Sequence, residues 1–588
     1  MTKLAVPVKF NNPMKQVYDG FWLPENIRSN LITPNTDWVV QYHANGVPTN
    51  GQNPEAIGAR WPILSTTQWE YLLKALKDQR KPIPPDFIGR LTSALRVLFQ
   101  QFQLPENPFT SEAIQISQAY TGYSQEMIRF ATSIFEETPF EEIEQMLCVK
   151  IPASAKTEYK SLKELDGPEG RVRFYSKKSS LLTKIFSDKQ SDPLPYKTDH
   201  PQMVLGYASG NVLGTAFIIN LLGQISALVN PNNSVSAHTP IPAVLVKNSR
   251  QEPFFVPFLF SALERIDPDL LSTSAIMIWD YEDESIQDLI ISEADLVLAA
   301  AADSTIQQID QQIKHVKPSV RFQPHGHKTS FTTIGKAYLA NPGDGGRRNP
   351  QELLGKIALL AAIDSILWDQ NGCLSSRIHF IEQNSETQFT SIDYGQTLVE
   401  KLRLLSKELP RGVIPLSRIH DRFDHFNAQT ISPQFTLCSN YEDDFIVVVD
   451  NRPWEPIQFR SIVNTCMERT IVIRPVDSVL DVPTKYLKQV PGNNLQTMYI
   501  AIDGEADNNW SNQLTQFVEK VGKCGVTSIR SIGQSPFPQL AFSWDGYLPQ
   551  SLSLNYPKGY FTTVEFNHNY TQIMQTSQWL ENRLGQSF

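Results

Sequence analysis

The stretch Trp368-Asp369-Gln370-Asn371-Gly372-Cys373-Leu374-Ser375-Ser376-Arg377 lies between a helical pattern and an apolar, strand-like run. The helix is expected to begin near Asn349, which can cap it, and Pro350, which suits a first turn. Cys373 therefore falls on a short Asn-Gly connection, where rigid flanking elements can hold a side chain out into a cleft. A thiolate there could form an acyl thioester, which divides one difficult step into two easier ones. From this stretch alone, the favoured interpretation is that Cys373 is a small buried residue without a chemical function.

Upstream of this stretch, short apolar strands alternate with helices from about residue 202. This pattern predicts a parallel, doubly wound sheet. Such sheets bind ligands at the carboxyl ends of their strands, where helix amino termini can hold phosphate. The pattern therefore indicates a nucleotide-binding α/β domain. The expected strands are 242–247, 274–280, 295–300 and 320–323, and the expected helices are 253–266, 284–294 and 304–313.

Composition narrows the class of protein. The net charge of -9 gives no reason to expect a nucleic-acid binder. The five cysteines form no CxxC pair, which argues against a disulfide framework or a cysteine zinc site. The most apolar stretch, 203–229, is interrupted by Gly, Asn and Gln residues and is interpreted as buried core rather than a membrane span. We expect a cytoplasmic protein.

The amino-terminal part is harder to assign. Residues 1 to 60 are rich in Asn, Pro and Gly and indicate an irregular or short-stranded lead-in. Apolar faces at helical spacing then predict helices from Thr66, from Phe87 and from Ser124, which can act as a cap. Lysines and prolines between residues 177 and 201 suggest a polar linker and a first domain boundary.

Several motifs together resemble one family. Gln370-Asn371-Gly372-Cys373, with Ser376-Arg377 just after, is similar to the nucleophile segment of the aldehyde dehydrogenase superfamily, and closer to its LuxC-like long-chain acyl-CoA reductase branch. Stretches at 206–214, 326–331 and 544–546 match that branch in the same order. The resemblance implies an aldehyde-dehydrogenase-like α/β fold with a parallel-sheet nucleotide-binding domain, an α/β catalytic domain and a mostly helical N-terminal extension. The implied divisions are a largely helical region of open role at 1–195, an NAD(P)-binding domain at 196–328, a catalytic domain with Cys373 at 329–545, and a return segment at 546–588.

The turn Gly210–Gly214 follows a strand-like run and precedes an apolar helix. An asparagine at such a turn can present its amide to an oxyanion. By resemblance, Asn211 is the superfamily asparagine that helps the backbone amide of Cys373 hold the thioester oxygen. An ordinary Asn-containing turn is the alternative.

The resemblance also implies a cofactor site. A lysine in the position of Lys247 binds the adenine-side ribose in the superfamily, and a glutamate three residues later selects NAD. Arg250 stands in the place of that glutamate and favours a 2′-phosphate, hence NADPH over NADH. Alanines replace the glycines that the family places at 300–302, while Asp303 and Ser304 could cap the next helix. The expected cofactor-binding residues are Lys247, Ser249, Arg250, Ala302, Ser304 and Gly326.

Two further segments leave alternatives open. Pro324 stands where hydrolytic aldehyde dehydrogenases carry a water-activating glutamate, so acyl transfer to a thiol or reduction is expected rather than hydrolysis. His325 or His327 could act as an acid–base group, and their spacing does not suggest zinc. The Asp545-Gly546 pair is interpreted chemically as an ordinary turn, and a polar loop is expected around residues 421–424.

The sequence thus predicts NADPH-dependent reduction of a fatty acyl thioester, carried by coenzyme A or another carrier, to the aldehyde through an acyl-enzyme on Cys373. The alternatives are aldehyde oxidation on the same fold and a non-catalytic binding or scaffold protein. By analogy with the luminescence system, we expect an acyl-activating or acyl-transferring partner and a homo-oligomer, with no metal.

Overall fold

The computed structural model describes most of the chain. The described residues are 15–42, 56–104, 106–137, 159–161, 171–176, 199–229, 239–340, 349–412, 416–454, 468–490, 494–502, 511–537, 544–547, 549–553, 561–564 and 570–585. The predicted boundary near residue 195 lies outside them. Within this part of the chain, no helix has the length and apolar character needed to cross a bilayer.

A five-stranded parallel sheet of order β10-β9-β6-β7-β8 forms the first lobe with the elements packed on it. Strand β6 is buried along its whole length, as expected when helices cover both faces of a parallel sheet. The strand order reverses between β6 and β9, which makes this pair the switch point of the sheet. The strands are β6 (Met203–Tyr207), β7 (Ala243–Lys247), β8 (Ser274–Met277), β9 (Leu296–Ala300) and β10 (Arg321–His325), and the helices are α8 (Thr215–Ile225), α9 (Phe255–Ile266), α10 (Glu284–Glu293) and α11 (Asp303–Val316). These elements confirm the predicted alternation.

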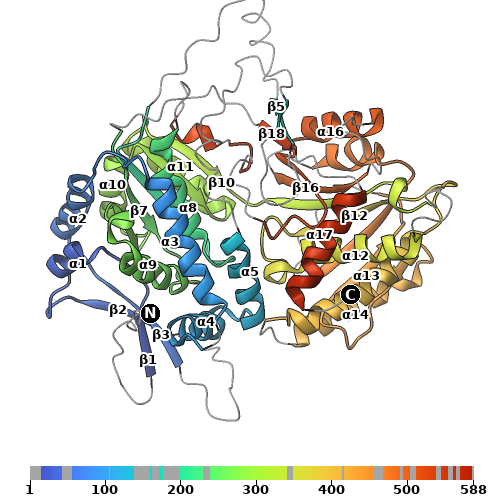
Figure 1. Cartoon of the computed structure of the whole chain (residues 1–588), viewed down its shortest axis with the longest axis horizontal. Coiled ribbons are helices and arrows are strands. Elements are labelled where there is room, and N and C mark those ends of the chain that lie inside the picture. Colours follow the sequence, from blue (N-terminus) through green and yellow to red (C-terminus); the bar gives the residue numbers. More distant parts are fainter. Residues whose placement is uncertain are drawn as a thin grey trace, which may run out of the picture.

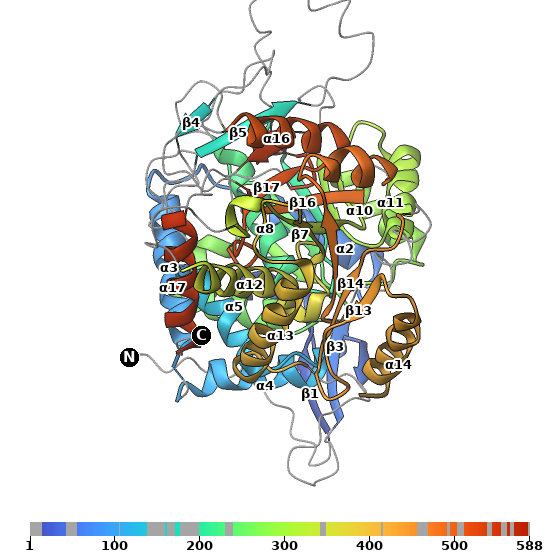
Figure 2. The ribbon, with the colours of Figure 1, turned by 90° about the vertical axis from the view of Figure 1, so that its right-hand side faces the viewer.

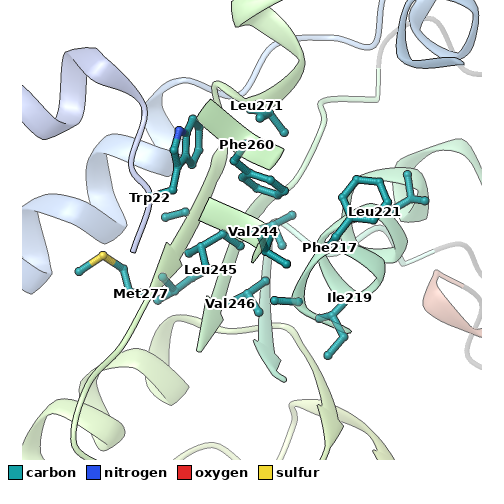
Figure 3. Packing of buried hydrophobic residues seen from close by; sticks show 14 of the residues in the cluster. Trp22, Phe217, Ile219, Leu221, Val244, Leu245, Val246, Phe260, Leu271 and Met277 are labelled. Carbon is teal, nitrogen blue, oxygen red and sulfur yellow. The ribbon is translucent and has the colours of Figure 1, made fainter. Parts of the chain in front are cut away.

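The amino-terminal region belongs to the same lobe. A small sheet of order β1-β3-β2 lies in the predicted short-stranded lead-in, and five helices accompany it. Trp22 bridges Ile276 on β8 and packs edge-on against Phe260 at 5.2 Å (Figure 3). One hydrophobic cluster therefore includes residues from Tyr18 to Val320. The elements are β1 (Lys15–Asp19), α1 (Glu25–Leu31), β2 (Trp38–Tyr42), β3 (Ala56–Pro62), α2 (Thr66–Asp78), α3 (Phe87–Phe102), α4 (Pro108–Thr121) and α5 (Gln125–Glu137).

A ten-stranded sheet of order β13-β14-β15-β12-β11-β16-β17-β18-β5-β4 forms the second lobe. Its strands run parallel from β14 to β18 and antiparallel at both ends. The strands are β4 (Tyr159–Ser161), β5 (Arg171–Ser176), β11 (Thr329–Ile334), β12 (Ser376–Glu382), β13 (Phe435–Leu437), β14 (Ile446–Asp450), β15 (Thr470–Val476), β16 (Leu495–Ala501), β17 (Ser528–Ser531) and β18 (Phe561–Val564). The helices are α12 (Pro350–Ile366), α13 (Ser391–Glu408), α14 (Leu416–Asn427), α16 (Asn512–Cys524) and α17 (Tyr570–Leu584). Figure 1 shows the first lobe in blue and green and most of the second in yellow to red.

The expected polar loop around residues 421–424 is wrong, because these residues lie within helix α14. Ile419 and Phe426 are buried and Phe423 packs against the core, so apolar side chains recur at helical spacing on one face. The charged residues between them occupy the other face. A helix with so many charges is easily mistaken for a loop.

Helix α5 connects the two lobes. Ile128 belongs to the hydrophobic cluster of the first lobe, whereas Met127, Phe130 and Ile134 belong to that of the second. In the second lobe, α12 packs against both α13 and α17, and the two views show these three helices together (Figures 1 and 2). The turn that carries Cys373 follows α12, a helix whose side chains from Leu353 onward are almost all buried.

Candidate active site

The segment from α12 to β12 contains an unusual backbone run. Trp368, Asp369 and Gln370 have φ values of 55°, 50° and 64°, so three successive residues other than glycine are left-handed. Each such residue costs roughly 1–2 kcal/mol relative to the right-handed conformation. Strain of this kind persists only where the surroundings hold it, and it gathers at functional sites.

Side chains of the same residues hold this run in place. Asp369 accepts hydrogen bonds from Arg469 Nε at 2.8 Å and from the Gly412 amide at 3.0 Å. Gln370 spans two strands, because its Nε2 donates to the Ser376 and Thr470 carbonyls and its Oε1 accepts from the Thr470 amide. Trp368 meets the ring of Tyr123 edge-on at 5.1 Å. These contacts therefore fix the backbone of residues 368–370, which leads into the turn with Cys373.

Cys373 lies at the tip of this turn, as predicted. Ser330 Oγ donates to the Cys373 carbonyl at 2.7 Å, and Tyr499 OH donates to the Leu374 carbonyl at 2.9 Å. Gln496 Nε2 donates to the sulfur at 3.4 Å. Strand β11, which carries Ser330, pairs with β12, and β16, which carries Gln496 and Tyr499, pairs with β11 on its other side. The sheet therefore fixes the position of the sulfur.

The thiol of Cys373 is protonated at neutral pH. Burial, and then the negative charge of Asp545, raises its pKa to about 11, although the hydrogen bond from Gln496 and the charge of Arg377 partly oppose these effects. Part of the Cys373 residue is accessible, although its thiol lies deep among protein atoms. A thiolate nucleophile therefore needs a group that removes the proton.

Asp545 and Gly546 form a turn, as expected, between the bridged residues Trp544 and Tyr547, but the Asp545 side chain is buried rather than exposed. Asp545 has a φ of 52°, and its side chain is only 2% exposed. One carboxylate oxygen accepts from Gln496 Nε2 at 2.7 Å, and the other lies 3.0 Å from His325 Nδ1. The His325 ring stacks on Trp544, with centroids 3.7 Å apart. A buried network thus runs from the Cys373 sulfur through Gln496 and Asp545 to His325.

The two histidines left open by the sequence have different surroundings. His325 ends β10 and is buried, and its Nε2 has no hydrogen-bond partner among the described residues. His327 is partly buried, and its pKa is lowered by burial and by the nearby Arg377. Among the described residues, no group of three or more His, Cys, Asp and Glu side chains could hold a metal ion.

Asn211 lies against the turn that carries Cys373. Its Nδ2 donates to the Asn371 carbonyl at 2.7 Å, two residues before Cys373. Tyr123 OH donates to the Asn211 carbonyl at 2.5 Å and lies 3.5 Å from Asn371 Nδ2. An amide nitrogen carries two hydrogens, so Asn211 retains a second donor. The structure thus brings the two predicted catalytic residues together across the lobes.

Lys247 and Arg250 lie at the carboxyl end of β7. The Lys247 ammonium group donates to the Trp279 carbonyl and sits 4.5 Å from the centre of the Trp279 ring. Burial, and then the charge of Arg250, lowers the pKa of Lys247 to about 7. Arg250 is more exposed, 3.5 Å from Asp280, and its guanidinium carbon lies 5.5 Å from the centre of the Trp61 ring. Two basic side chains, Lys247 and Arg250, therefore lie beside the indole rings of Trp279 and Trp61.

Ser249 and the Asn211 turn are in close contact. A Cβ atom at Gly210 would approach Ser249 Oγ to 2.4 Å, so the turn requires glycine there. Ser249 Oγ itself accepts from the Gln251 amide at 3.1 Å. Ser249 therefore supports the loop geometry at the ends of β6 and β7.

The helix α11 begins at Asp303, after Ala302, and its amino terminus has no side-chain cap. The expectation that Asp303 or Ser304 caps this helix is wrong. Asp303 instead accepts from the His327 amide at 2.7 Å, and its oxygen would lie 2.3 Å from a Cβ atom at Gly326. Ala302 and Ser304 are exposed beside it.

The switch point of the five-stranded sheet can accommodate a dinucleotide. Helices α8 and α11 follow β6 and β9, the two strands at this point, and neither amino terminus has a hydrogen bond from a capping side chain. Helix amino termini bind phosphate through their backbone amides. Lys247 and Arg250 add positive charge at the neighbouring strand. The donor set at the switch point therefore fits a phosphorylated dinucleotide.

Sequence reasoning missed three residues of the network around Cys373: Gln496, Tyr123 and Trp544. Gln496 lies within an otherwise apolar strand and is only 2% exposed, so a buried glutamine was the available signal. The Trp544-Asp545-Gly546 motif was noticed, but the partners of Asp545, Gln496 and His325, lie 49 and 220 positions away along the chain.

Solved structures with the same architecture are aldehyde dehydrogenases. The NAD-dependent benzaldehyde dehydrogenase of Corynebacterium glutamicum is 10% identical, with a TM-score of 0.52 over 90% of this chain and 96% of that chain. Methylmalonate-semialdehyde dehydrogenase (DddC) of Oceanimonas doudoroffii is 12% identical, with a TM-score of 0.53 over 90% of this chain and 96% of that chain. Aldehyde dehydrogenase 21 of Physcomitrella patens is 8% identical, with a TM-score of 0.50 over 91% and 96% of the two chains. The fold is thus that of the aldehyde dehydrogenase superfamily.

A match of the sequence to a family model assigns the chain to one family with this fold. The family model described as acyl-CoA reductase (LuxC) matches residues 240–549, which is more than half of the chain. The protein belongs to the LuxC acyl-CoA reductase family and is an aldehyde-forming oxidoreductase, and the predicted family and fold class are confirmed. The family and the fold together imply a nicotinamide cofactor. No match to the chain is found among curated proteins.

Proposed function

We propose that this protein reduces a fatty acyl thioester to the aldehyde with NADPH, through an acyl-enzyme on Cys373. The observation that carries the proposal is the position of the Cys373 sulfur. It sits on a turn whose carbonyls are held by Ser330 and Tyr499, and the Asn211 amide reaches the same turn. A nucleophile fixed beside oxyanion donors is the arrangement that acyl transfer requires.

In the proposed reaction, the Cys373 sulfur attacks the thioester carbon and the carrier thiol leaves. The second hydrogen of Asn211 Nδ2 and the backbone amide of Cys373 hold the carbonyl oxygen as it gains charge. When bound, the cofactor supplies a hydride, which is the redox chemistry of the reaction. The resulting hemithioacetal on Cys373 collapses, which releases the aldehyde and restores the sulfur.

Lys247 and Arg250 are the proposed ligands for the adenine-side ribose and its 2′-phosphate. Arg250 is exposed, and its one described ion pair, with Asp280, is 3.5 Å long, so it can turn toward a phosphate. An arginine can hold a phosphate with two parallel hydrogen bonds. Ser249, Ala302, Ser304 and Gly326 are proposed to line the remainder of this site, near the α11 amino terminus. A long acyl chain, an acyl-transferring partner and a homo-oligomer remain predictions from the resemblance.

The test follows the loss of NADPH absorbance, and separately that of NADH, with a long-chain acyl-CoA and an aldehyde trap. We expect acyl-dependent oxidation that is abolished in Cys373→Ala and retained in Cys438→Ala, since Cys438 is also partly buried with a pKa raised to about 11 by burial. Aldehyde production by Cys373→Ala would refute the acyl-enzyme.

Cofactor choice has its own test. Charge-assisted hydrogen bonds contribute about 1.5–3 kcal/mol, so Arg250→Ser should weaken NADPH binding by roughly 10- to 100-fold and leave NADH binding nearly unchanged. Arg403→Ser is the control, because Arg403 pairs with Asp443 in the second lobe. Equal losses for both cofactors would contradict the assignment of Arg250 to the 2′-phosphate.

A further inference from the structure

Gln496 donates directly to the Cys373 sulfur and has no role in the reaction as described so far. It lies in strand β16, where every residue is buried, and is itself only 2% exposed. Its Nε2 lies 3.4 Å from the sulfur and 2.7 Å from Asp545 Oδ1. Its Oε1 is buried and has no hydrogen-bond partner among the described residues. The nitrogen end of this amide is therefore the end that the site uses.

Asp545 determines which end of the Gln496 amide faces the sulfur. A carboxylate can only accept hydrogen bonds, so the amide nitrogen, and not the amide oxygen, must face Asp545. The nitrogen carries two hydrogens, and with one on Asp545 the second is available to the sulfur. Asp545 is itself held, because its other oxygen lies 3.0 Å from His325 Nδ1. The carboxylate thus excludes the rotation of the amide that would place Oε1 at the sulfur.

The two neighbours of the sulfur act on its charge in opposite directions. Burial, and then the charge of Asp545, raises the pKa of the Cys373 thiol, whereas the hydrogen bond from Gln496 lowers it. Asp545 therefore does not favour the thiolate by its charge, but its geometry presents the donor that does. Hydrogen bonds to charged acceptors are stronger than those to neutral ones, so the contact from Gln496 gains strength when the thiol loses its proton.

We propose that Gln496 is a catalytic residue of the Cys373 site, and that Asp545 is the positioning residue for its amide. This inference rests on the proposed acyl transfer and adds the stabilisation of its nucleophile. The sulfur is negative twice in each cycle: before it attacks the thioester carbon, and after its bond to the aldehyde carbon breaks. Gln496 donates the same hydrogen bond at both points.

Protons and electrons balance with Gln496 as a neutral donor throughout. The Cys373 thiol loses one proton and its sulfur bonds to the thioester carbon, and the carrier leaves as a thiolate with the electron pair of the broken bond. After hydride addition, the hemithioacetal breaks and leaves its electron pair on the Cys373 sulfur. The two thiolates then take one proton each. One thioester, one hydride and one proton thus give the aldehyde and the carrier thiol.

The first experiment measures the rate at which iodoacetamide alkylates Cys373 in the full chain at pH 8, read from the Cys373 peptide by mass spectrometry. Gln496→Met removes the donor at nearly constant volume. The thiolate fraction falls, although a thiolate of higher pKa is more nucleophilic, so alkylation should slow by roughly 4- to 20-fold. A purely structural role predicts the opposite sign, because a loosened site exposes the sulfur. Gln323→Met is the matched control and should react at the wild-type rate, since Gln323 is also a buried glutamine but donates to Ser551.

Alkylation of Cys438 in the same samples shows whether each variant keeps its fold, because Cys438 is partly buried in the second lobe. If Gln496→Met exposes Cys438, Gln496→Asn replaces it in the experiment. Its side chain is one methylene shorter and cannot reach both Asp545 and the sulfur, so the same slowing is expected. Unchanged or faster alkylation of Cys373 in the folded variant would overturn the proposal.

A double-mutant cycle tests the role of Asp545. Asp545→Asn removes the charge and the fixed acceptor, and asparagine tolerates the left-handed φ of 52° at this position. Removal of the charge alone would speed alkylation by the same factor whether residue 496 is Gln or Met. We expect a smaller gain with Gln496 present, because its amide is then free to turn Oε1 toward the sulfur. Equal factors in the two backgrounds would overturn the positioning role.

The last measurement is the release of carrier thiol from acyl-CoA in a single turnover without cofactor. Gln496→Met should lower the maximal rate and leave the acyl-CoA concentration at half the maximal rate unchanged, because Gln496 contacts the sulfur. Slow alkylation together with wild-type thiol release would overturn the catalytic role. If Gln496→Met slows alkylation but wild-type protein releases no thiol, the hydrogen bond to the sulfur retains its role and the proposed acyl transfer fails.

Discussion

Replacement of Gln370 by methionine tests whether the left-handed run before Cys373 depends on its side-chain hydrogen bonds. Gln370 is fully buried and makes three hydrogen bonds of 3.0, 2.8 and 2.9 Å to the backbones of β12 and β15. Methionine has nearly the same length and volume, so Gln370→Met removes these bonds without opening a large cavity.

The expected loss of stability follows from the partners left behind. A buried donor or acceptor that loses its partner costs about 1–3 kcal/mol, and three backbone groups are affected. At the lower limit for each, the free energy of unfolding should fall by about 3 kcal/mol.

Urea unfolding of Gln370→Met and Gln351→Met provides the comparison. Gln351 is exposed in the first turn of α12, so its replacement should change stability by no more than about 0.5 kcal/mol. Alkylation of Cys373 should also become faster in Gln370→Met at constant pH, because the turn loosens. Equal stability of the two variants would refute the reasoning.

Two further predictions concern pH. The pKa of the Cys373 thiol is about 8.5 in an unfolded chain but about 11 in the folded protein, so the folded state binds more protons between these pH values. The free energy of unfolding therefore falls as pH rises through this interval. Cys373→Ala should lose less free energy of unfolding than wild type between pH 8.5 and 10, and parallel plots of the free energy of unfolding against pH would contradict this. His379, buried between Ser365 and Tyr394, has its pKa lowered by burial to about 3. The unfolded chain therefore takes up the proton first and stability falls from about pH 6.5 downward, so His379→Gln should flatten the acid limb of a urea-unfolding series, and an unchanged limb would contradict the assignment.

The sequence predicts the first lobe well because the strands of its five-stranded sheet, except β10, are almost entirely buried and its helices are amphipathic. Strands such as β7 and β9 read as short apolar runs, and the turns between them contain Gly, Pro or Asp. The helix α14 was missed because its charged face dominates its composition. A helix or strand is therefore predictable from its own residues when their apolar side chains form a clear pattern, as in β7 and β9, and is missed when charged residues dominate, as in α14.

The candidate site was predictable only in part. Cys373 and Asn211 were found because each belongs to a short motif at a strand–helix turn. Gln496 and Asp545 were not assigned, because their meaning depends on strands that pair across long sequence separations. No local property of a buried glutamine or of an Asp-Gly pair indicates which distant histidine or sulfur it will contact.

The carboxyl-terminal helix α17 has a consequence for the order of folding during synthesis. Its Glu581 pairs with Lys356 on α12, and its Arg583 donates two hydrogen bonds to Ser133 on α5. The cover over α12 is therefore incomplete until residues 570–584 have been made. At 5–20 residues per second, the roughly 200 residues between α12 and α17 take on the order of 10 to 40 s. A newly made chain thus carries Cys373 on an unfinished lobe for that time, when oxidation or binding by a chaperone competes with closure.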